Sequence, residues 1–335
     1  MGPRLQRFLT ASLLTAAAFG FILGCDSEAY PYYLRHDHGI LWVANAADNT
    51  VTCINRYSDR EIGTYSVGPS PSRTAVDLSG NCWVGCRSDD SVWYVTIEGE
   101  KEEYNGFNAA RGVALDRNGD LWVANSGNQT IQWIETESGT VSEQVIVPGA
   151  NYLYGAVIDG ENTLWLSDSS QGNVIRYPIS SFPSESAFET IDVTSIYGIT
   201  LDLDGNVWAA GQDGWIRRID PNTHEIEEWP SEASFLSGAT VDINNRLWFC
   251  ADSLNALIRF DQESEDSLLV PIGASPHGVA ADDAGFVYAV NRTDDSVTKV
   301  DARNGDVVHE FSVGNDPYTY SDLTGFIYRK VTLGL

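Results

Sequence analysis

The chain has 335 residues, and its 47 acidic and 20 basic side chains give a formal net charge of −27 at pH 7. A surface this acidic repels phosphate backbones and anionic lipid headgroups, which excludes nucleic acid as an expected partner. Any contact with a membrane is therefore expected to come through an attached lipid.

The first 24 residues have the features of a secretory signal peptide. Arg4 and Arg7 precede an apolar run that is too short for a lasting membrane span. The run ends in Ile22-Leu23-Gly24-Cys25, which resembles the lipobox of bacterial lipoproteins, although Ile22 replaces the usual leucine. This resemblance implies cleavage before Cys25, acylation of the Cys25 thiol, and anchoring in the bacterial cell envelope, on the periplasmic side or at the surface. The alternative is an ordinary cleaved signal in which Cys25 has no role.

Residues 25–38 carry no repeat and are predicted to be an acylated cysteine followed by a tether. Within this stretch, His36 and His38 flank Asp37. A catalytic zinc site usually needs three protein ligands, and no third one lies nearby in the sequence. We therefore expect a solvated tether.

From Gly39 onward one unit recurs, typified by GVALDRNGDLWVAN at residues 112–125. Each copy has an aspartate six residues before an aromatic side chain, and a glycine or asparagine three residues after the aspartate. Glycine and asparagine accept a left-handed backbone at low cost, so the unit is predicted to be a β-hairpin. The aspartates are Asp77, Asp116, Asp159, Asp202, Asp242, Asp282 and Asp322. The aromatics are Trp83, Trp122, Trp165, Trp208, Trp248, Tyr288 and Tyr328.

The spacing of these units predicts an all-β fold, a seven-bladed β-propeller of four-stranded antiparallel blades over residues 39–335. The period is 39 to 43 residues, with four strand-like runs in each unit. The first copy begins in its second strand at Ile40, and Pro317–Gly325 supplies a surplus inner strand. We therefore expect the C-terminal strand to complete the N-terminal blade and close the ring. The repeated aromatics are expected to form the core, whereas the place of residues 326–335 stays open.

Four cysteines remain after Cys25, namely Cys53, Cys82, Cys86 and Cys250. Cys82 and Cys86 share one expected strand, so their Cα atoms lie about 13 Å apart, beyond disulfide reach. Cys53 of the neighbouring blade is the alternative partner for either one in an oxidising compartment. Cys250 is expected to be a small buried residue.

Candidate ligand-binding residues lie where the inner strands begin. Arg111, Tyr154 and Tyr197 stand five residues before their turn aspartates, and Arg73 and Tyr318 replace a glycine one place later. Arginine side chains bind carboxylates and phosphates, and tyrosine rings stack on other rings or sugars. The alternative is that both arginines pair with the protein's own carboxylates.

The repeats resemble those of the NHL and YVTN propellers and of the seven-bladed streptogramin B lyase (virginiamycin B lyase) family. That family linearises a cyclic depsipeptide antibiotic by elimination, with Mg²⁺, a histidine base and carboxylates. The resemblance implies His277, in Pro276-His277-Gly278, as a catalytic base and Asp168 as a catalytic carboxylate. Asp168 is the one carboxylate at the corresponding position of the seven repeats.

Two functions follow. The first is a lipid-anchored, monomeric binding module for an envelope protein, peptide or glycan, with no required cofactor. The second is a metal-assisted lyase or lactone-opening enzyme around His277, Arg73, Arg111 and Asp168, with Mg²⁺ or Ca²⁺. Divalent-ion binding by the protein would separate them.

Overall fold

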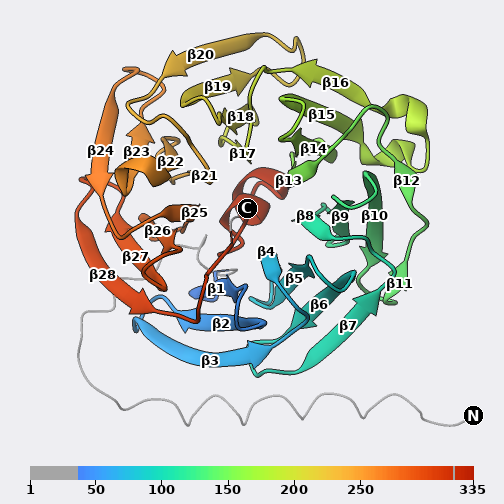
Figure 1. Ribbon diagram of the computed structural model, residues 1–335, viewed down its shortest axis with the longest axis horizontal. Helices are drawn as coiled ribbons and strands as arrows, with labels where there is room; N and C mark the ends of the chain where they lie inside the picture. The colour runs from blue at the N-terminus through green and yellow to red at the C-terminus, as the bar shows by residue number, and fades with distance from the viewer. Residues whose placement is uncertain (1–36, 320) are drawn as a thin grey trace, which may run out of the picture.

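The computed structural model describes residues 37–319 and 321–335, and seven sheets surround a central axis (Figure 1). The predicted seven-bladed propeller of antiparallel blades is thus confirmed. The predicted signal peptide, the acylation site Cys25 and residues 25–36 of the predicted tether lie outside the described residues. No helix in the described ranges is long and apolar enough to cross a membrane.

Blade 1 contains β1 (Ile40–Asn45), β2 (Thr50–Asn55) and β3 (Arg60–Ser66). Blade 2 contains β4 (Pro71–Val76), β5 (Cys82–Cys86), β6 (Ser91–Val95) and β7 (Lys101–Asn105). Blade 3 contains β8 (Ala110–Leu115), β9 (Leu121–Asn125), β10 (Thr130–Glu135) and a split outer strand, β11 (Thr140–Val141) and β12 (Val145–Ile146). Blade 4 contains β13 (Leu153–Ile158), β14 (Thr163–Asp168), β15 (Asn173–Pro178) and β16 (Glu189–Asp192), with the short helices η2 (Ile179–Ser181) and η3 (Glu185–Ala187) before β16.

Blade 5 contains β17 (Gly198–Leu201), β18 (Val207–Ala210), β19 (Trp215–Ile219) and β20 (Ile226–Pro230). Blade 6 contains β21 (Ala239–Val241), β22 (Leu247–Ala251), β23 (Ala256–Phe260) and β24 (Ser267–Pro271), with η4 (Asp252–Leu254) after β22. Blade 7 contains β25 (Pro276–Ala281), β26 (Phe286–Asn291), β27 (Ser296–Asp301) and β28 (Val307–Ser312).

The C-terminal segment closes the ring as expected. After β28 the chain lies along β1, where Ala46 N donates to Asp316 O at 2.9 Å and Tyr318 N donates to Ala44 O at 3.0 Å. Further on, Trp42 N donates to Leu323 O at 3.0 Å. The segment therefore fills the inner position of blade 1 with an irregular strand.

The repeated aspartate stabilises each hairpin from within. In blade 3, Asp116 Oδ1 accepts the amides of Asn118 at 2.8 Å and Asp120 at 3.0 Å, and Asp116 Oδ2 accepts Trp122 Nε1–H at 3.1 Å. Gly119 has φ +86°, the left-handed conformation that the glycine or asparagine of the repeat was expected to supply. The aspartate thus joins the turn to the buried tryptophan of the next strand, which confirms the hairpin and core predictions.

The cysteines in the described part of the chain are all free and buried, so the alternative of a Cys53 disulfide is not realised. Burial raises the pKa of the Cys53 and Cys86 thiols to about 12. Cys250 is fully buried in the core, as predicted for a small residue at that position.

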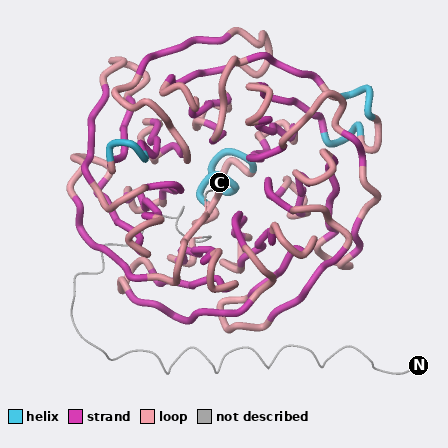
Figure 2. Tube along the Cα trace, in the orientation of Figure 1, coloured by secondary structure: helices cyan, strands magenta, loops and turns pink. Residues whose placement is uncertain are grey.

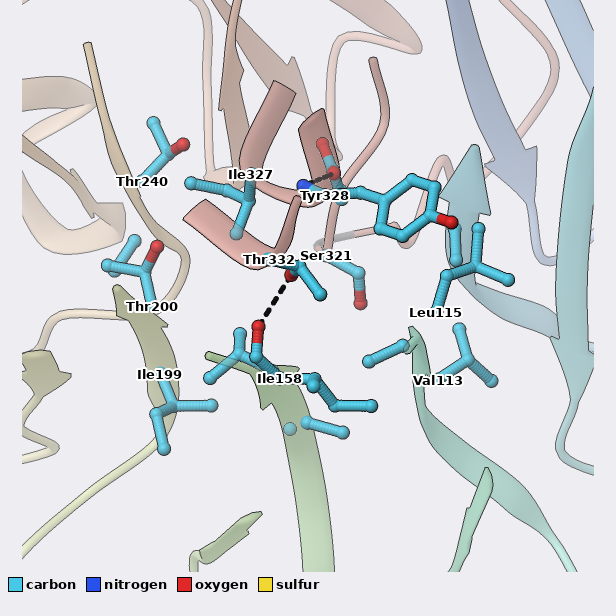
Figure 3. Close-up of a pocket in the computed structure, with 17 residues that line it drawn as sticks. Val113, Leu115, Ile158, Ile199, Thr200, Thr240, Ser321, Ile327, Tyr328 and Thr332 are labelled. Carbon is cyan, nitrogen blue, oxygen red and sulfur yellow. Dashed lines mark hydrogen bonds between the residues drawn. The ribbon is translucent and has the colours of Figure 1, made fainter. Parts of the chain in front are cut away.

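The last residues of the chain lie at the centre of the ring (Figures 1 and 2), where they plug the central channel beside the ends of the inner strands. Residues 322–335 fold inward, and the short helix η5 (Tyr328–Thr332) lies at their centre. Thr332 donates its hydroxyl to Ile158 O at 2.6 Å, and Tyr328 N donates to Asp322 Oδ2 at 2.8 Å (Figure 3). Tyr328 is therefore a buried helical residue of the plug, where it packs in the core as expected of the repeated aromatics, and the place left open for residues 326–335 is the plug.

A buried ion pair cluster holds the start of the described chain to the ring. Asp37 is 8% exposed, and Arg56 forms ion pairs with both Asp37 and Asp282. Arg56 Nε also donates to Ile40 O at 3.0 Å. Asp37 is thus part of the propeller, and the predicted tether to residue 38 extended too far.

The same cluster holds the plug. Arg329 Nη2 lies 2.6 Å from Asp283 Oδ2 and 3.7 Å from Asp37 Oδ1, and Lys330 Nζ lies 2.8 Å from Asp283 Oδ1. Both ends of the described chain therefore meet in one network at the seam between blades 7 and 1.

Candidate functional site at the channel mouth

The end of the channel opposite the plug is surrounded by side chains from the first residues of the inner strands. Each inner strand begins at this end and finishes at its turn aspartate, next to the plug. We call this end the channel mouth, and it contains Arg73, Arg111, Tyr154, Tyr197, His277 and Tyr318. The structure thus brings together the five predicted ligand-binding residues and the predicted catalytic histidine.

Three tyrosine hydroxyl groups meet at the centre of the mouth. The Tyr154 hydroxyl is hydrogen-bonded to those of Tyr197 and Tyr318, and the Tyr197 and Tyr318 hydroxyl oxygens are 3.0 Å apart. His277 Nε2 lies 3.3 Å from the Tyr197 hydroxyl oxygen. Tyr154, Tyr318 and His277 are buried, whereas Tyr197 is half-buried and extends the group toward solvent.

Arginine side chains surround these rings. The guanidinium carbon of Arg73 lies 4.5 Å from the Tyr154 ring centroid, and that of Arg111 lies 4.8 Å from it. The same two groups lie 5.6 and 5.9 Å from the Tyr318 ring centroid, within the range of cation–π attraction. Arg111 is 9% exposed, and its Nη1 is buried with no hydrogen-bond partner among the described residues.

The sequence analysis missed two further arginines of the mouth, Arg87 and Arg292. Each guanidinium carbon lies 4.5 Å from the Tyr318 ring centroid, and both side chains are partly exposed. Arg292 Nε is also paired with Asp316 Oδ1 at 2.6 Å. Both arginines stand one residue after the end of a second strand. The alignment of repeats compared the residue at the end of that strand, and comparing the next residue as well would have found them.

The cationic surroundings change the ionisation of Tyr318. Burial opposes ionisation of its phenol, but the charges of Arg73 and His277 and the hydrogen bonds from Tyr154 and Tyr197 outweigh burial and lower the Tyr318 pKa to about 6. Burial raises the pKa of Tyr154 and of Tyr197, and the charge of Tyr318 adds to this at both, whereas Arg73 and Arg111 oppose it at Tyr154 without outweighing burial. Tyr318 is therefore the phenol that ionises first.

We expect tyrosinate absorbance in the native protein to appear as the pH rises through about 6, because the Tyr318 pKa is lowered from the ordinary value of 10.0. The folded state then releases a proton that the unfolded state retains between these two values, so stability rises with pH in this window. The contribution is lost as the pH falls through about 6. An ultraviolet pH titration measures the step. Tyr318→Phe should remove it, and a step that persists in this variant would contradict the assignment.

His277 and Asp168, the two predicted catalytic residues, are held by different contacts. His277 Nδ1 lies 3.4 Å from Asp252 Oδ2, a residue that the sequence analysis missed and that also stands one place after a second strand. Asp168 is fully buried, and its two oxygens accept the amides of Asn151 at 2.7 Å and Tyr152 at 3.0 Å. The structure therefore gives His277 the carboxylate of Asp252, while Asp168 holds the loop before β13.

Asp168 has the same role as Asn125, which stands at this position in blade 3. Asn125 Oδ1 accepts the Asn108 amide at 3.0 Å, and Asn125 Nδ2 donates to Thr130 Oγ1 at 3.0 Å. In both blades the side chain at the end of the second strand accepts an amide from the loop before the inner strand. A carboxylate at this position meets the same structural requirement as an amide.

The residues of the mouth do not fit a divalent cation. Among the described residues, no group of three or more His, Cys, Asp or Glu side chains is arranged to hold a metal ion. The charged groups around Tyr318 are guanidinium groups, which repel a cation, whereas Mg²⁺ and Ca²⁺ take oxygen ligands. This arrangement favours an anion.

Comparison with known proteins supports the architecture. The NHL repeat family matches residues 107–134, which contain the β8–β9 hairpin. The match covers one repeat, in blade 3, of the seven-bladed β-propeller that the sheets define. A search of curated protein sequences gives no significant match.

Similar solved structures include the lyases expected from the sequence. A streptogramin B lyase superimposes with a TM-score of 0.67 at 19% identity, over 76% of this chain and 91% of that one. A catalytically inactive virginiamycin B lyase from Staphylococcus aureus with quinupristin gives 0.67 at 21% identity, over 76% and 88%. Hydrazine synthase from Kuenenia stuttgartiensis gives 0.69 at 18% identity, over 80% and 93%. At these identities the likeness shows the fold, which hosts unrelated functions.

Proposed function

We propose that this protein is a binding module of the bacterial cell envelope, lipid-anchored through Cys25, that takes an anionic group of a protein, peptide or glycan into the channel mouth. The observation that carries the proposal is Arg111, a guanidinium that is 9% exposed and has an unsatisfied Nη1 among the described residues. A buried charged donor without an acceptor is costly, and a ligand carboxylate or phosphate would satisfy it. No required cofactor enters this proposal, and the protein acts as a monomer.

The half-exposed residues of the mouth supply the remaining contacts. Arg87 and Arg292 offer guanidinium groups at the solvent side, and the rings of Tyr152 and Tyr197 offer faces for stacking on a peptide or sugar ring. Tyr318 contributes a negative charge once it has ionised. An incoming anion would compete with this phenolate for the arginines, so its binding should raise the Tyr318 pKa.

Calorimetric titration of the purified protein tests the proposal. The probes are short peptides with a free C-terminal carboxylate, the same peptides with a C-terminal amide, glucuronate and glucose. We expect the carboxylate probes to bind and the neutral ones to bind at least about tenfold more weakly, since one charge-assisted hydrogen bond is worth roughly 1.5–3 kcal/mol. Arg111→Met should weaken the carboxylate probes by a similar factor.

Arg117→Met is the matched control, because Arg117 is an exposed arginine of the same blade on the plug side. It should leave every affinity unchanged. In the wild-type protein, binding should also reduce the tyrosinate absorbance measured at neutral pH. Equal affinity for acid and amide probes, or full binding by Arg111→Met, would overturn the proposed anion site.

The second candidate is a lyase or lactone-opening enzyme, which is favoured by one observation, the placement of His277 between Asp252 and Tyr197. A carboxylate that orients a histidine ring is the arrangement of a general base. Since the surrounding residues do not fit a metal ion, this candidate would rely on the side chains alone. Turnover of a cyclic depsipeptide or a lactone that is lost in His277→Ala would support it, and no turnover by the wild-type protein would exclude it for those substrates.

A further inference from the structure

A cavity opens on the plug side of the ring, between blades 2 and 3 and away from the channel mouth. Its volume is about 390 Å³, within the usual range of small-ligand sites. Trp83, Tyr94 and Tyr104 of blade 2 and Tyr328 of the plug line it, so the C-terminal segment forms one wall. Figure 1 shows β4–β7 beside β8–β10 around the central plug.

Trp83 differs from the other tryptophans at its position in the repeat. In four blades the indole N–H donates to the turn aspartate, as from Trp165 to Asp159 at 2.7 Å and from Trp248 to Asp242 at 2.8 Å. In blade 1, Trp42 Nε1 donates to Gly80 O at 2.9 Å.

In blade 2 the turn aspartate has another partner. Asp77 Oδ2 accepts the Tyr94 hydroxyl at 2.9 Å, and the Trp83 Nε1–H has no acceptor among the residues that the structure describes. Trp83 is nevertheless only 3% exposed and lines the cavity. The Nε1 atom itself is reached by solvent, so the cavity presents an N–H group that a ligand oxygen can accept in place of water.

The walls of the cavity are aromatic and acidic. The Trp83 ring centroid lies 4.6 Å from that of Tyr94 and 5.4 Å from that of Tyr104. The lining also contains Asp77, Glu102 and Glu137, and no lysine, arginine or histidine. Aromatic faces together with unbalanced carboxylates attract organic cations, which is the opposite preference from that of the mouth.

We propose that this cavity binds a protonated amino sugar. The ammonium group is held by Glu102 and Glu137 at the rim, the sugar ring packs on the aromatic side chains, and a hydroxyl oxygen accepts the Trp83 N–H. This site is independent of the anion site at the mouth, since the two share no residue. If experiments exclude one of the two sites, the other can still be tested.

The test is calorimetric titration of the purified protein with glucosamine, N-acetylglucosamine and glucuronate. Glucosamine should bind, N-acetylglucosamine should bind at least about tenfold more weakly because it lacks the charge, and glucuronate should not bind at this site. Trp83→Phe keeps a smaller aromatic ring and removes the N–H together with the five-membered ring of the indole, and it should weaken glucosamine binding about tenfold. Glu137→Gln should have a similar effect.

Glu263→Gln is the matched control, because Glu263 is an exposed acid in the corresponding turn of blade 6. It should leave glucosamine binding unchanged. Equal affinity for glucosamine and N-acetylglucosamine would show a neutral-sugar site and overturn the proposed charge preference. Glucosamine binding that survives both Trp83→Phe and Glu137→Gln, or no binding of glucosamine at all, would overturn the site itself.

Discussion

Replacing Trp122 by alanine is expected to lower the free energy of unfolding by about 3–5 kcal/mol, the range for truncating a buried aromatic residue. Trp122 is 4% exposed, and its ring stacks on Trp133 at 6.3 Å and meets Phe182 edge-on at 5.6 Å. Truncation also leaves Asp116 Oδ2 without the indole N–H that it accepts. The variant therefore loses both core packing and part of the hairpin network.

Urea unfolding followed by tryptophan fluorescence and by far-ultraviolet circular dichroism measures this loss. Trp215→Ala is the matched control, because Trp215 begins the third strand of blade 5 and is 38% exposed. It removes the same side chain from a partly solvated position, so its cost should be well under half of that at Trp122. Similar losses at the two positions would contradict the role of the repeated tryptophan in the blade core.

The fold was largely predictable because its signal is local. The aspartate, the glycine or asparagine and the aromatic of each unit act within one hairpin, so their chemistry can be recognised from spacing alone. Asp116 and Gly119 show this directly, since one accepts the turn amides and the other has the positive φ. Closure of the ring followed from counting strands, which also needs no distant contact.

The plug and the buried ion pairs could not be predicted in this way. Residues 326–335 carry no repeat, and their position depends on contacts such as that of Arg329 with Asp283. Asp37 lies 19 residues from Arg56, and its sequence neighbours suggested a solvated tether. Only the folded ring brings these charges together.

The alignment of repeats predicted the site residues at the start of the inner strands, but it did not predict every residue of the site. The start of each inner strand gave Arg73, Arg111 and the tyrosines, which the structure places together. Arg87, Arg292 and Asp252 come from the other strand, one residue beyond the position compared between repeats. The sequence did not reveal the role of Asp168 either. An aspartate that accepts loop amides cannot be distinguished by sequence from an aspartate that takes part in catalysis.

The two ends of the channel differ in charge. The mouth gathers arginines around Tyr318, whereas the cavity beside the plug gathers carboxylates around Trp83. The net charge of −27 belongs to the whole chain, and it does not predict the local charge at either end of the channel. Ligands of opposite charge are therefore expected on opposite faces, and each face can be altered without changing the other.

Replacing Arg56 by methionine is expected to destabilise the protein by about 3–5 kcal/mol, because it leaves buried carboxylates without their counter-charge. Arg56 is 1% exposed and pairs with Asp37 and Asp282, both of which are also buried. Burial opposes ionisation of Asp37, but Arg56 and then Arg329 outweigh it and lower the Asp37 pKa. Without Arg56 this pKa should rise.

Thermal and urea unfolding at several pH values measure both effects. The loss at neutral pH should shrink as the pH is lowered, since protonated carboxyl groups no longer need a counter-charge. Arg303→Met is the matched control, because Arg303 pairs with Asp301 but its side chain is 79% exposed, and an exposed pair contributes little to stability. If Arg56→Met cost no more than Arg303→Met, the buried cluster would not be what holds the start of the described chain and the plug to the ring.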